Sequence, residues 1–454
     1  MTQLVGEHRV LQWIGGLPGR WEVAALGTRL RENKSSNKGM VESQVLSLSY
    51  GRVVVKPQEK LRGLVPASFE TYQILEPGDI VIRPTDLQND QTSLRIGQST
   101  HRGIITSAYI AVRPQNGLDQ RYAAFLLSAY DFMKVFYGFG SGLRQNLDFK
   151  HIKHIPIPVP PLEEQRLIVR YLDNAELRIA QAIAGKNQVL SLLREAKASI
   201  ISELVIGQSS NMKETGVLGL GDVPSHWRVL RGKSVWRAVD VRSTSGQEER
   251  LSVSSARGIV PRASANVTMF QAASYVGHKV VRPGDLVINS LWAWAMGLGV
   301  SKHHGIVSPV YGVYELVDSE SDTRYLDYFL RSNVCQWQFQ VRSKGIWKSR
   351  LSLTDEAFLD MTMVLPPLAE QRTIADLIEE RTCSVDKAMD AVTSEITLLR
   401  EYRAKLISDV VTGKLDVREE AAKMSDVDPA ALVTVLAGGS TNSDTEEDDD
   451  NADN

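Results

Sequence analysis

The sequence predicts a mixed α+β fold of two similar halves, each an α/β region followed by a long helix. Pro161-Leu162-Glu163-Glu164-Gln165-Arg166 recurs 206 residues later as Pro367-Leu368-Ala369-Glu370-Gln371-Arg372. Trp21 recurs as Trp227, and Pro77-Gly78-Asp79 recurs as Pro283-Gly284-Asp285, at the same offset. Self-similarity at a fixed offset is the signature of a duplicated structural unit. We therefore expect an internal pseudo-twofold repeat that presents two similar surfaces.

The end of each half is expected to be one long helix. Segments 161–207 and 367–413 are identical at 16 of 47 positions, whereas unrelated sequences of ordinary composition match at about one position in fifteen. Each segment opens with proline and acidic residues, which suit a first helical turn, and closes on a glycine, which suits a C-cap. Apolar residues recur every three or four positions, a coiled-coil-like pattern. The first stripe is Leu172, Ala175, Ile179, Ala182, Val189, Leu193, Ala196, Ile200 and Leu204, and the second is Ile378, Val385, Ala388, Val392, Leu399, Tyr402 and Leu406.

The two helices are expected to pair with each other, antiparallel. A first helix from Gln165 to Ile206 would be about 60 Å long at 1.5 Å per residue, with a break near Asp173-Asn174 as the alternative. A single helix of this length with one apolar stripe needs a partner in water. The linker 208–220 spans at most about 45 Å, which is too short for a return along the whole helix. We therefore expect two globular heads at opposite ends of a two-helix rod.

The globular regions combine short apolar segments with helical ones. Strands are expected at 73–75 and 79–82 around a Pro-Gly turn, and at 104–106 and 109–112, with a helix at 122–132. The second half repeats this pattern at 285–288, 307–316 and 325–330, whereas 29–72 and 235–276 cannot be aligned. The expected divisions are 1–159, first mixed region; 160–207, first helix; 208–220, linker; 221–365, second mixed region; 366–415, second helix; and 416–454, a disordered acidic tail.

The composition is that of a soluble globular protein, with 43% hydrophobic and 23% charged residues. The isolated cysteines Cys335 and Cys383 exclude a disulfide framework and a Cys-based zinc site. No run reaches the length of a membrane span, and the N-terminus lacks the apolar core of a signal peptide, so a cytoplasmic location is expected. Residues 419–454 carry an excess of ten acids, which leaves a net charge of +8 on residues 1–418. A basic folded part suits a polyanionic partner.

The paired Pro-Leu-x-Glu-Gln-Arg motifs, each opening a long helix after a variable region, resemble the specificity subunit of type I restriction–modification systems. The resemblance covers roughly residues 15–416 and includes Gly284-Asp285-Leu286-Val287-Ile288-Asn289 and Gly305-Ile306-Val307-Ser308-Pro309-Val310-Tyr311. It implies two target-recognition domains that read the two halves of a split DNA sequence. It also implies helices that act as a spacer and dock two methyltransferase subunits, which two restriction subunits can join. This chain would be non-catalytic, and S-adenosylmethionine, with ATP and Mg when the nuclease is present, would belong to the partners.

Candidate DNA contacts are loop residues whose side chains match the donor and acceptor patterns of base edges. Many of them would contact phosphate rather than bases, and a solvated surface residue is the alternative for each. Arg144 and Arg350 occupy equivalent positions, with a structural salt bridge as the alternative. The candidates are Arg29, Asn33, Lys34, Asn37, Lys38, Arg83, His101, Arg102, Arg144 and Gln145 in the first domain, and Arg242, Arg257, Asn289, His303, His304, Lys344, Lys348 and Arg350 in the second.

Other residues carry weaker hypotheses. Glu164, Gln165, Arg166, Glu370, Gln371 and Arg372 are candidates for contact with a partner subunit, although helix capping explains Glu164 equally well. Trp292 and Trp294 could stack on bases, but core packing is the simpler explanation. His303-His304 lacks a carboxylate or thiolate at ligand spacing, so no metal site is expected.

Two other classes of function compete with DNA recognition. A self-sufficient DNA methyltransferase would need an Asn/Asp-Pro-Pro-aromatic motif, and Leu365-Pro366-Pro367-Leu368 lacks both flanking residue types. Gly219-Leu220-Gly221 is too short for a nucleotide-binding turn, and the sequence contains no phosphate-binding Gly-x-x-x-x-Gly-Lys loop. A coiled-coil scaffold without DNA contact would not require basic, divergent heads. Salt-dependent binding to duplex DNA distinguishes these alternatives.

Overall fold

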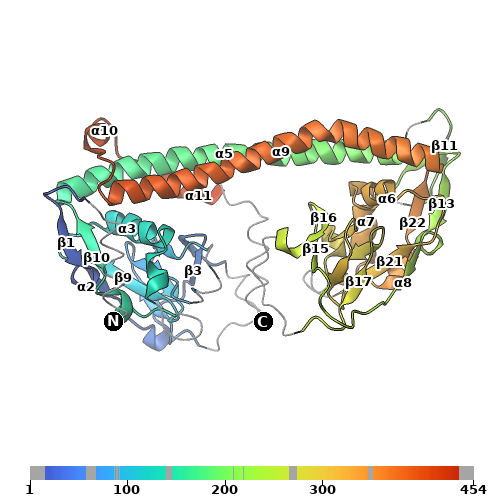
Figure 1. Ribbon diagram of the computed structural model, residues 1–454. Helices are drawn as coiled ribbons and strands as arrows, with labels where there is room; N and C mark the ends of the chain where they lie inside the picture. The colour runs from blue at the N-terminus through green and yellow to red at the C-terminus, as the bar shows by residue number, and fades with distance from the viewer. Residues whose placement is uncertain are drawn as a thin grey trace. The chain divides into compact units, whose positions relative to one another are not determined.

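The computed structural model describes residues 16–57, 68–85, 87, 90, 93–139, 146–207, 209–217, 219–264, 274–345 and 351–438. The chain divides into two compact units (Figure 1). Unit 1 comprises residues 1–187 and 394–454, and unit 2 comprises residues 188–393. Each unit is therefore built from residues of both sequence halves.

Unit 1 is assembled from short antiparallel strands with helices packed beside them. A four-stranded sheet has the order β2-β9-β6-β7, and the pairs β1-β10, β3-β4 and β5-β8 complete the unit. The strands are β1 (Glu22–Ala25), β2 (Leu30–Glu32), β3 (Leu46–Ser49), β4 (Arg52–Val55), β5 (Gln73–Leu75), β6 (Ile80–Ile82), β7 (Ile96–Gln98), β8 (Gly103–Ile105), β9 (Ile110–Pro114) and β10 (Pro156–Val159). The helices of this region are α2 (Leu26–Arg29), η1 (Lys38–Met40), α3 (Gln120–Phe132), η3 (Val135–Gly138) and α4 (Phe149–Ile152).

Unit 2 repeats this topology. Its four-stranded sheet has the order β14-β21-β18-β19, and β13-β22, β15-β16 and β17-β20 form the matching pairs. The strands are β13 (Arg228–Arg231), β14 (Trp236–Ala238), β15 (Leu251–Ser254), β16 (Gly258–Pro261), β17 (Lys279–Val281), β18 (Leu286–Ile288), β19 (Leu298–Val300), β20 (Gly305–Val307), β21 (Gly312–Leu316) and β22 (Thr362–Leu365). The helices are η4 (Gly232–Ser234), η5 (Arg262–Ser264), η6 (Ala293–Ala295), α6 (Thr323–Leu330), α7 (Asn333–Arg342) and α8 (Asp355–Leu359).

The mixed α+β class is confirmed, and the strand pairing refines it. All pairs between the named strands are antiparallel. Each globular region is therefore α+β in the strict sense, because a parallel α/β sheet needs a crossover helix between successive strands. Here the strands are three to five residues long and are joined by turns and short loops.

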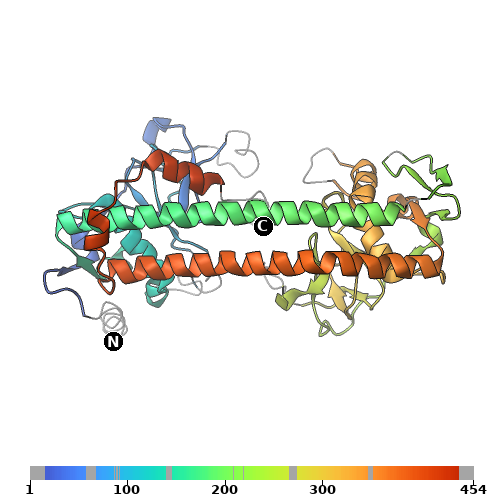
Figure 2. The ribbon, with the colours of Figure 1, turned by 90° about the horizontal axis from the view of Figure 1, so that it is seen from above.

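The two long helices are α5 (Leu162–Ile206) and α9 (Leu368–Val411). In unit 1, Glu176 on α5 pairs with Arg403 on α9, at 2.9 Å from its Nη2 atom, and Lys186 on α5 pairs with Glu395 on α9. The residue numbers of the partners on α9 fall as the residue numbers on α5 rise, so the two helices run antiparallel. In unit 2, Lys197 Nζ lies 2.6 Å from Asp386 Oδ1. The expected antiparallel pairing is thus present within each unit, where Figure 2 shows the two helices side by side. The alternative break near Asp173-Asn174 is not found, since α5 continues through it.

Each globular region is anchored to the end of the long helix from the other sequence half. In unit 1, the Tyr122 hydroxyl on α3 donates to the carbonyl oxygens of Pro158 (3.1 Å) and of Val411, at the end of α9 (3.4 Å). In unit 2, the Tyr325 hydroxyl on α6 donates to the carbonyl oxygens of Val364 (3.2 Å) and of Val205, near the end of α5 (3.3 Å). Val205 and Val411 lie 206 positions apart, so they are equivalent residues of the two halves. The same contact is therefore made twice, each time between a tyrosine of one half and the long helix of the other half.

The glycines after the helices pack against the repeated tryptophans. Gly207 and Gly413 have φ values of +70° and +73°, the left-handed conformation that ends a helix. A Cβ atom on Gly207 would lie 2.5 Å from the ring of Trp227, and one on Gly413 would lie 2.7 Å from Pro18 Cδ and 3.4 Å from Trp21. Glycine is therefore required twice over, by the backbone conformation and by the lack of space.

Two segments contain secondary structure that the sequence did not predict. Residues 208–220 were expected to be a polar, Gly-rich linker, and within them β11 (Met212–Glu214) pairs with β12 (Asp222–Pro224). Such short strands have no readable periodicity. Disorder was expected from residue 416, yet α10 (Arg418–Ala422) and α11 (Pro429–Gly438) are helical.

The beginning of this C-terminal segment is held by apolar burial and by polar contacts to α5. Val417 is part of the apolar core of unit 1, and Ala421 is buried as well. Arg170 Nε lies 2.6 Å from Asp426 Oδ1, and Asn174 Nδ2 donates to the Ser425 carbonyl at 3.0 Å. The acidic residues 439–454 lie outside the described residues. Over the described part of the chain, no helix combines the length and the apolar character needed to cross a membrane.

Replacing Tyr122 or Tyr325 with Phe should lower the free energy of unfolding by about 1–2 kcal/mol, because the buried carbonyls lose a donor. Urea unfolding followed by circular dichroism measures this change. Tyr402→Phe, which removes the hydroxyl of a tyrosine in unit 1 that is 55% exposed, provides a control for the effect of removing any hydroxyl. If both buried variants were as stable as the wild type, the anchoring role would be refuted.

Candidate nucleic-acid interface

The repeated Glu-Gln-Arg motif joins each long helix to its globular region. Gln165 is fully buried: its Oε1 accepts from the Asp119 N–H at 2.7 Å, and its Nε2 donates to the carbonyls of Gly117 and Pro160. Gln371 repeats this geometry, accepting from the Asp322 N–H at 2.8 Å and donating to the carbonyls of Glu320 and Pro366. Asp119 and Asp322 in turn cap α3 and α6. The motif thus fixes the angle between the long helix and the helix that carries the anchoring tyrosine.

The glutamate of the motif binds the residues around the repeated tryptophan. Arg20 donates from Nε and Nη2 to the Glu164 carboxylate at 2.7 and 2.8 Å, and this pair holds the pKa of Glu164 below its usual value. In unit 2, Trp227 Nε1 donates to Glu370 Oε1 at 3.0 Å, and His226 Nε2 lies 2.8 Å from Glu370 Oε2. Among the residues predicted to contact a partner subunit, the two glutamines are buried, and the two glutamates bind side chains of their own unit. Arg166 and Arg372 remain exposed.

The two units present basic residues on matching turns. Ser99 Oγ donates to the His101 carbonyl at 2.7 Å in the turn between β7 and β8. Ser301 Oγ donates to the His303 carbonyl at 2.8 Å in the turn between β19 and β20. Both serines are buried, and the backbone of each bonds to the repeated Pro-Gly-Asp turn.

The exposed residues of the matching turns differ between the units. They are Thr100-His101-Arg102 in unit 1 and Lys302 and His304, with half-buried His303, in unit 2. Lys302 was not among the candidates predicted from sequence. The repeat itself could have identified it. In this region the two halves are offset by 202 residues, so Ser99 and His101 match Ser301 and His303, and Lys302 matches Thr100.

The other candidates of unit 1 separate into structural and exposed residues. Asn33 Nδ2 donates to the Ile74 carbonyl at 2.8 Å, and buried Asn37 donates to the Glu42 carbonyl at 2.9 Å, so both amides hold turns. Arg29 binds Glu22 at 2.6 Å and the Asn116 carbonyl. The exposed candidates are Lys34, which pairs with Glu32; Lys38; Arg83, which is partly exposed and lies 3.6 Å from Asp90; and Arg102, which pairs with Glu42 and Glu76.

The candidates of unit 2 divide in the same way. Asn289 Oδ1 accepts from the Leu291 N–H at 3.2 Å, which makes Asn289 part of a turn. Exposed Arg242 pairs with Asp240 at 2.7 Å and holds the pKa of that carboxyl below its usual value. Arg257, His304 and Lys344 are also exposed. Arg144, Gln145, Lys348 and Arg350, including the equivalent arginine pair, lie outside the described residues, so their DNA-binding roles stay predictions.

The tryptophans of the loop after β18 are partly buried. Trp294 Nε1 donates to the Leu291 carbonyl at 3.0 Å, and Ala293 between the two tryptophans is buried. This supports packing as their first role. Among the described residues, no group of three or more His, Cys, Asp or Glu side chains is arranged to hold a metal ion.

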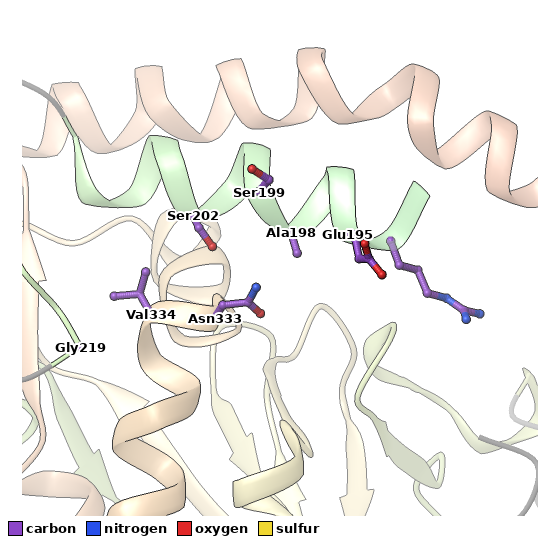
Figure 3. Close-up of a pocket in the computed structure, with 8 residues that line it drawn as sticks. Glu195, Ala198, Ser199, Ser202, Gly219, Asn333 and Val334 are labelled. Carbon is purple, nitrogen blue, oxygen red and sulfur yellow. The ribbon is translucent and has the colours of Figure 1, made fainter. Parts of the chain in front are cut away.

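Unit 2 also has an open hollow of about 670 Å³ beside α5 (Figure 3). Glu195, Ala198 and Ser202 of α5 face Asn333 and Val334 at the start of α7, and Gly219 lies at its edge. Arg194 and Ser199 complete the lining. The hollow has no cluster of catalytic groups, and its lining is that of a shallow contact surface.

The arrangement is that of a recognition protein: two units of one topology, with different cations on matching turns. A family model described as the type I restriction modification DNA specificity domain matches residues 102–191. The chain is 21% identical to the type I restriction enzyme MjaVIII specificity subunit of Methanocaldococcus jannaschii, over 88% of this chain and 94% of that protein. It is 19% identical to the putative MjaX specificity subunit of the same organism, over 89% and 96%.

A solved structure supports the fold. A chain from a study of the assembly and conformational transition of a type I restriction–modification system matches with a TM-score of 0.52 and 16% identity. The match covers 88% of this chain and all of that chain. The family model and the two relatives confirm the resemblance to type I specificity subunits that the sequence predicted.

Replacing Gln165 or Gln371 with Ala should destabilise the chain by about 2–4 kcal/mol, because three hydrogen bonds are lost in a buried setting. The exposed neighbours provide the control, since Arg166→Ala and Arg372→Ala should change stability by about 0.5 kcal/mol or less. Thermal and urea unfolding of the four variants compares them directly. Equal effects at the glutamines and the arginines would contradict the joining role of the motif.

Proposed function

We propose that this chain is the sequence-specific DNA-recognition subunit of a type I restriction–modification complex. The observation that carries the proposal is the duplicated architecture: one topology occurs twice, with different exposed cations on the same turns. Two similar but unequal units suit a target made of two different half-sites, because positioning on DNA comes from phosphate contacts and specificity from base contacts. The comparisons with type I specificity subunits support the same conclusion.

In this proposal the chain itself is non-catalytic. It would dock two methyltransferase subunits, which bring S-adenosylmethionine, and restriction subunits would bring ATP and Mg. The repeat supports the number two, since each helix end and each motif occurs twice in equivalent surroundings. A scaffold that does not bind DNA is the competing proposal. Salt-dependent binding of duplex DNA by the complex supports recognition, and its absence would favour the scaffold.

The two globular regions should read DNA independently. Replacing residues 15–158 with the first domain of another specificity subunit should change one half-site of the methylated sequence and leave the other unchanged. Sequencing that detects methylated bases in cells with each chimera measures both half-sites at once. The reciprocal replacement of residues 221–365 is the matched control, and should change the other half. A swap that altered both half-sites together would contradict modular reading.

The long helices should set the spacing between the half-sites. Inserting one helical turn of about four residues after both Gly185 and the equivalent Ala391 should lengthen the unspecified spacer and leave both half-sites unchanged. A substitution that leaves the helix length unchanged, Gly185→Ala, should keep the original spacer. The spacer is read from the methylated motif by the same sequencing. An unchanged spacer in a stable insertion variant would refute this role of the helices.

A further inference from the structure

The side chain of Arg95, at the end of the loop that joins β6 to β7 in unit 1, is completely buried. Its guanidinium donates to three main-chain carbonyls of the same loop, those of Arg83 (3.3 Å), Thr85 (2.6 Å) and Asp90. Its Nε donates to the Tyr137 hydroxyl at 3.0 Å, and its Cζ lies 5.3 Å from the centre of the Tyr137 ring. Because a buried charge is costly unless its donors are satisfied, these contacts fix Arg95 and the loop around it.

Arg95 holds the main chain of Arg83 on both sides. The Arg83 N–H donates to the Arg95 carbonyl at 2.9 Å, while the Arg83 carbonyl accepts from the Arg95 guanidinium. The side chain of Arg83 is nevertheless 38% exposed. Its Nη1 lies 3.6 Å from Asp90 Oδ2, which is longer than a hydrogen bond, so its donors can serve another acceptor. The loop thus presents a cation to solvent from a fixed main chain.

The equivalent loop of unit 2 is closed in the same way but differs in length and filling. Its Asn289 N–H donates to the Gly297 carbonyl at 2.8 Å, as the Arg83 N–H does to Arg95. Between and including these pairs the loop has 13 residues in unit 1 and nine in unit 2, which changes the offset between the halves from 206 to 202. In place of the buried arginine, unit 2 has Gly297 packed against Trp292, where a Cβ atom would lie 3.0 Å from Trp292 Cβ.

Both loops are also joined to the chain that precedes α4 or α8. The Leu147 N–H donates to the Pro84 carbonyl, and the Leu353 N–H donates to the Ser290 carbonyl, each at 2.9 Å. The two donors lie 206 positions apart and so do the two acceptors, so this second attachment is repeated as well. Loops whose attachments are kept while their length and filling change suit the reading of two different sequences.

We propose that Arg95 is a positioning residue for DNA reading by unit 1, and that Arg83, which it holds, contacts a guanine of the half-site read by that unit. This inference rests on the proposed function and assigns part of its specificity to particular residues. An arginine recognises guanine by directing two N–H donors at O6 and N7 in the major groove, which requires a fixed approach. Unit 2 has Asn289 at the equivalent position, and its Oδ1 accepts from the Leu291 N–H at 3.2 Å. The two units therefore cannot make the same contact here.

The test is the methylation specificity of the complete complex in cells, read by sequencing that detects modified bases. The exchange of residues 15–158 identifies the half-site that unit 1 reads. Sites with one mismatched base pair in either half are scored relative to the full target, so a smaller amount of folded chain does not change the ratio. Arg95→Met keeps an unbranched side chain but removes the donors. It should raise methylation at mismatches in that half-site at least about fivefold and leave the other half-site unchanged.

Arg83→Ala leaves the buried contacts of Arg95 with Thr85 and Tyr137 in place. It should relax the same half-site at one G·C pair, and it therefore tests the inference even if Arg95→Met fails to fold. Unchanged discrimination by Arg83→Ala or by a folded Arg95→Met chain would overturn the inference and leave the proposed function standing. Relaxation by Arg83→Ala at an A·T pair alone would do the same.

Arg121→Met is the matched control, because Arg121 of unit 1 also contacts an aromatic ring and a carboxylate. Its Cζ lies 4.5 Å from the centre of the Phe125 ring, and its Nη2 lies 2.8 Å from Asp173 Oδ1, so it holds α3 against α5. This variant should keep both half-sites strict. Relaxation equal to that of Arg95→Met would refute a specific role of Arg95, since it would show a general effect of removing a structural arginine from unit 1. A wild-type complex that methylated no two-part motif would contradict the proposed function itself.

Discussion

The structure depends on an exchanged contact between the two halves of the sequence. The buried hydroxyl of Tyr122 bonds to the end of the helix from the second half, and that of Tyr325 bonds to the helix from the first half. Burial raises the pKa of both phenols, so both remain protonated donors. Because the apolar cores include the same helix ends, neither globular region is complete without residues from the other half. One polypeptide thereby builds two units of mixed origin.

The halves share a scaffold but not a surface. The paired motifs, capping glycines and anchoring tyrosines are nearly the same in both units, whereas the cations on the matching turns differ. Such a division suits a protein that has to hold a fixed framework and read two unlike sequences. The C-terminal segment adds a second asymmetry. It contacts α5 in unit 1 through Arg170 and Asn174, where the second half has Asp376 and Glu380.

The scaffold could be predicted from the sequence, because periodicity and helix-end signals are local. The long helices, the strands on both sides of Pro77, the strand after Pro283 and the helix that carries Tyr122 were all predicted from such signals. The environments of single polar side chains could not be predicted, because they depend on tertiary contacts. Gln165 could not be distinguished from a surface residue, since a polar side chain near a helix start suits either a solvated or a buried bonded environment. Asn33 and Asn37 match base edges chemically, yet they also make the hydrogen bonds of turns. In the C-terminal segment, acidic composition concealed Val417 and Ala421, whose burial holds that segment in place.

The most direct measurement of the account is the methylation pattern of host DNA with and without this gene, read by sequencing that detects modified bases. Two unequal recognition units in one chain predict a single gene-dependent motif with two different specified parts, separated by a fixed number of unspecified bases. A continuous motif, or two identical parts, would contradict the central claim that each unit reads its own half of the target.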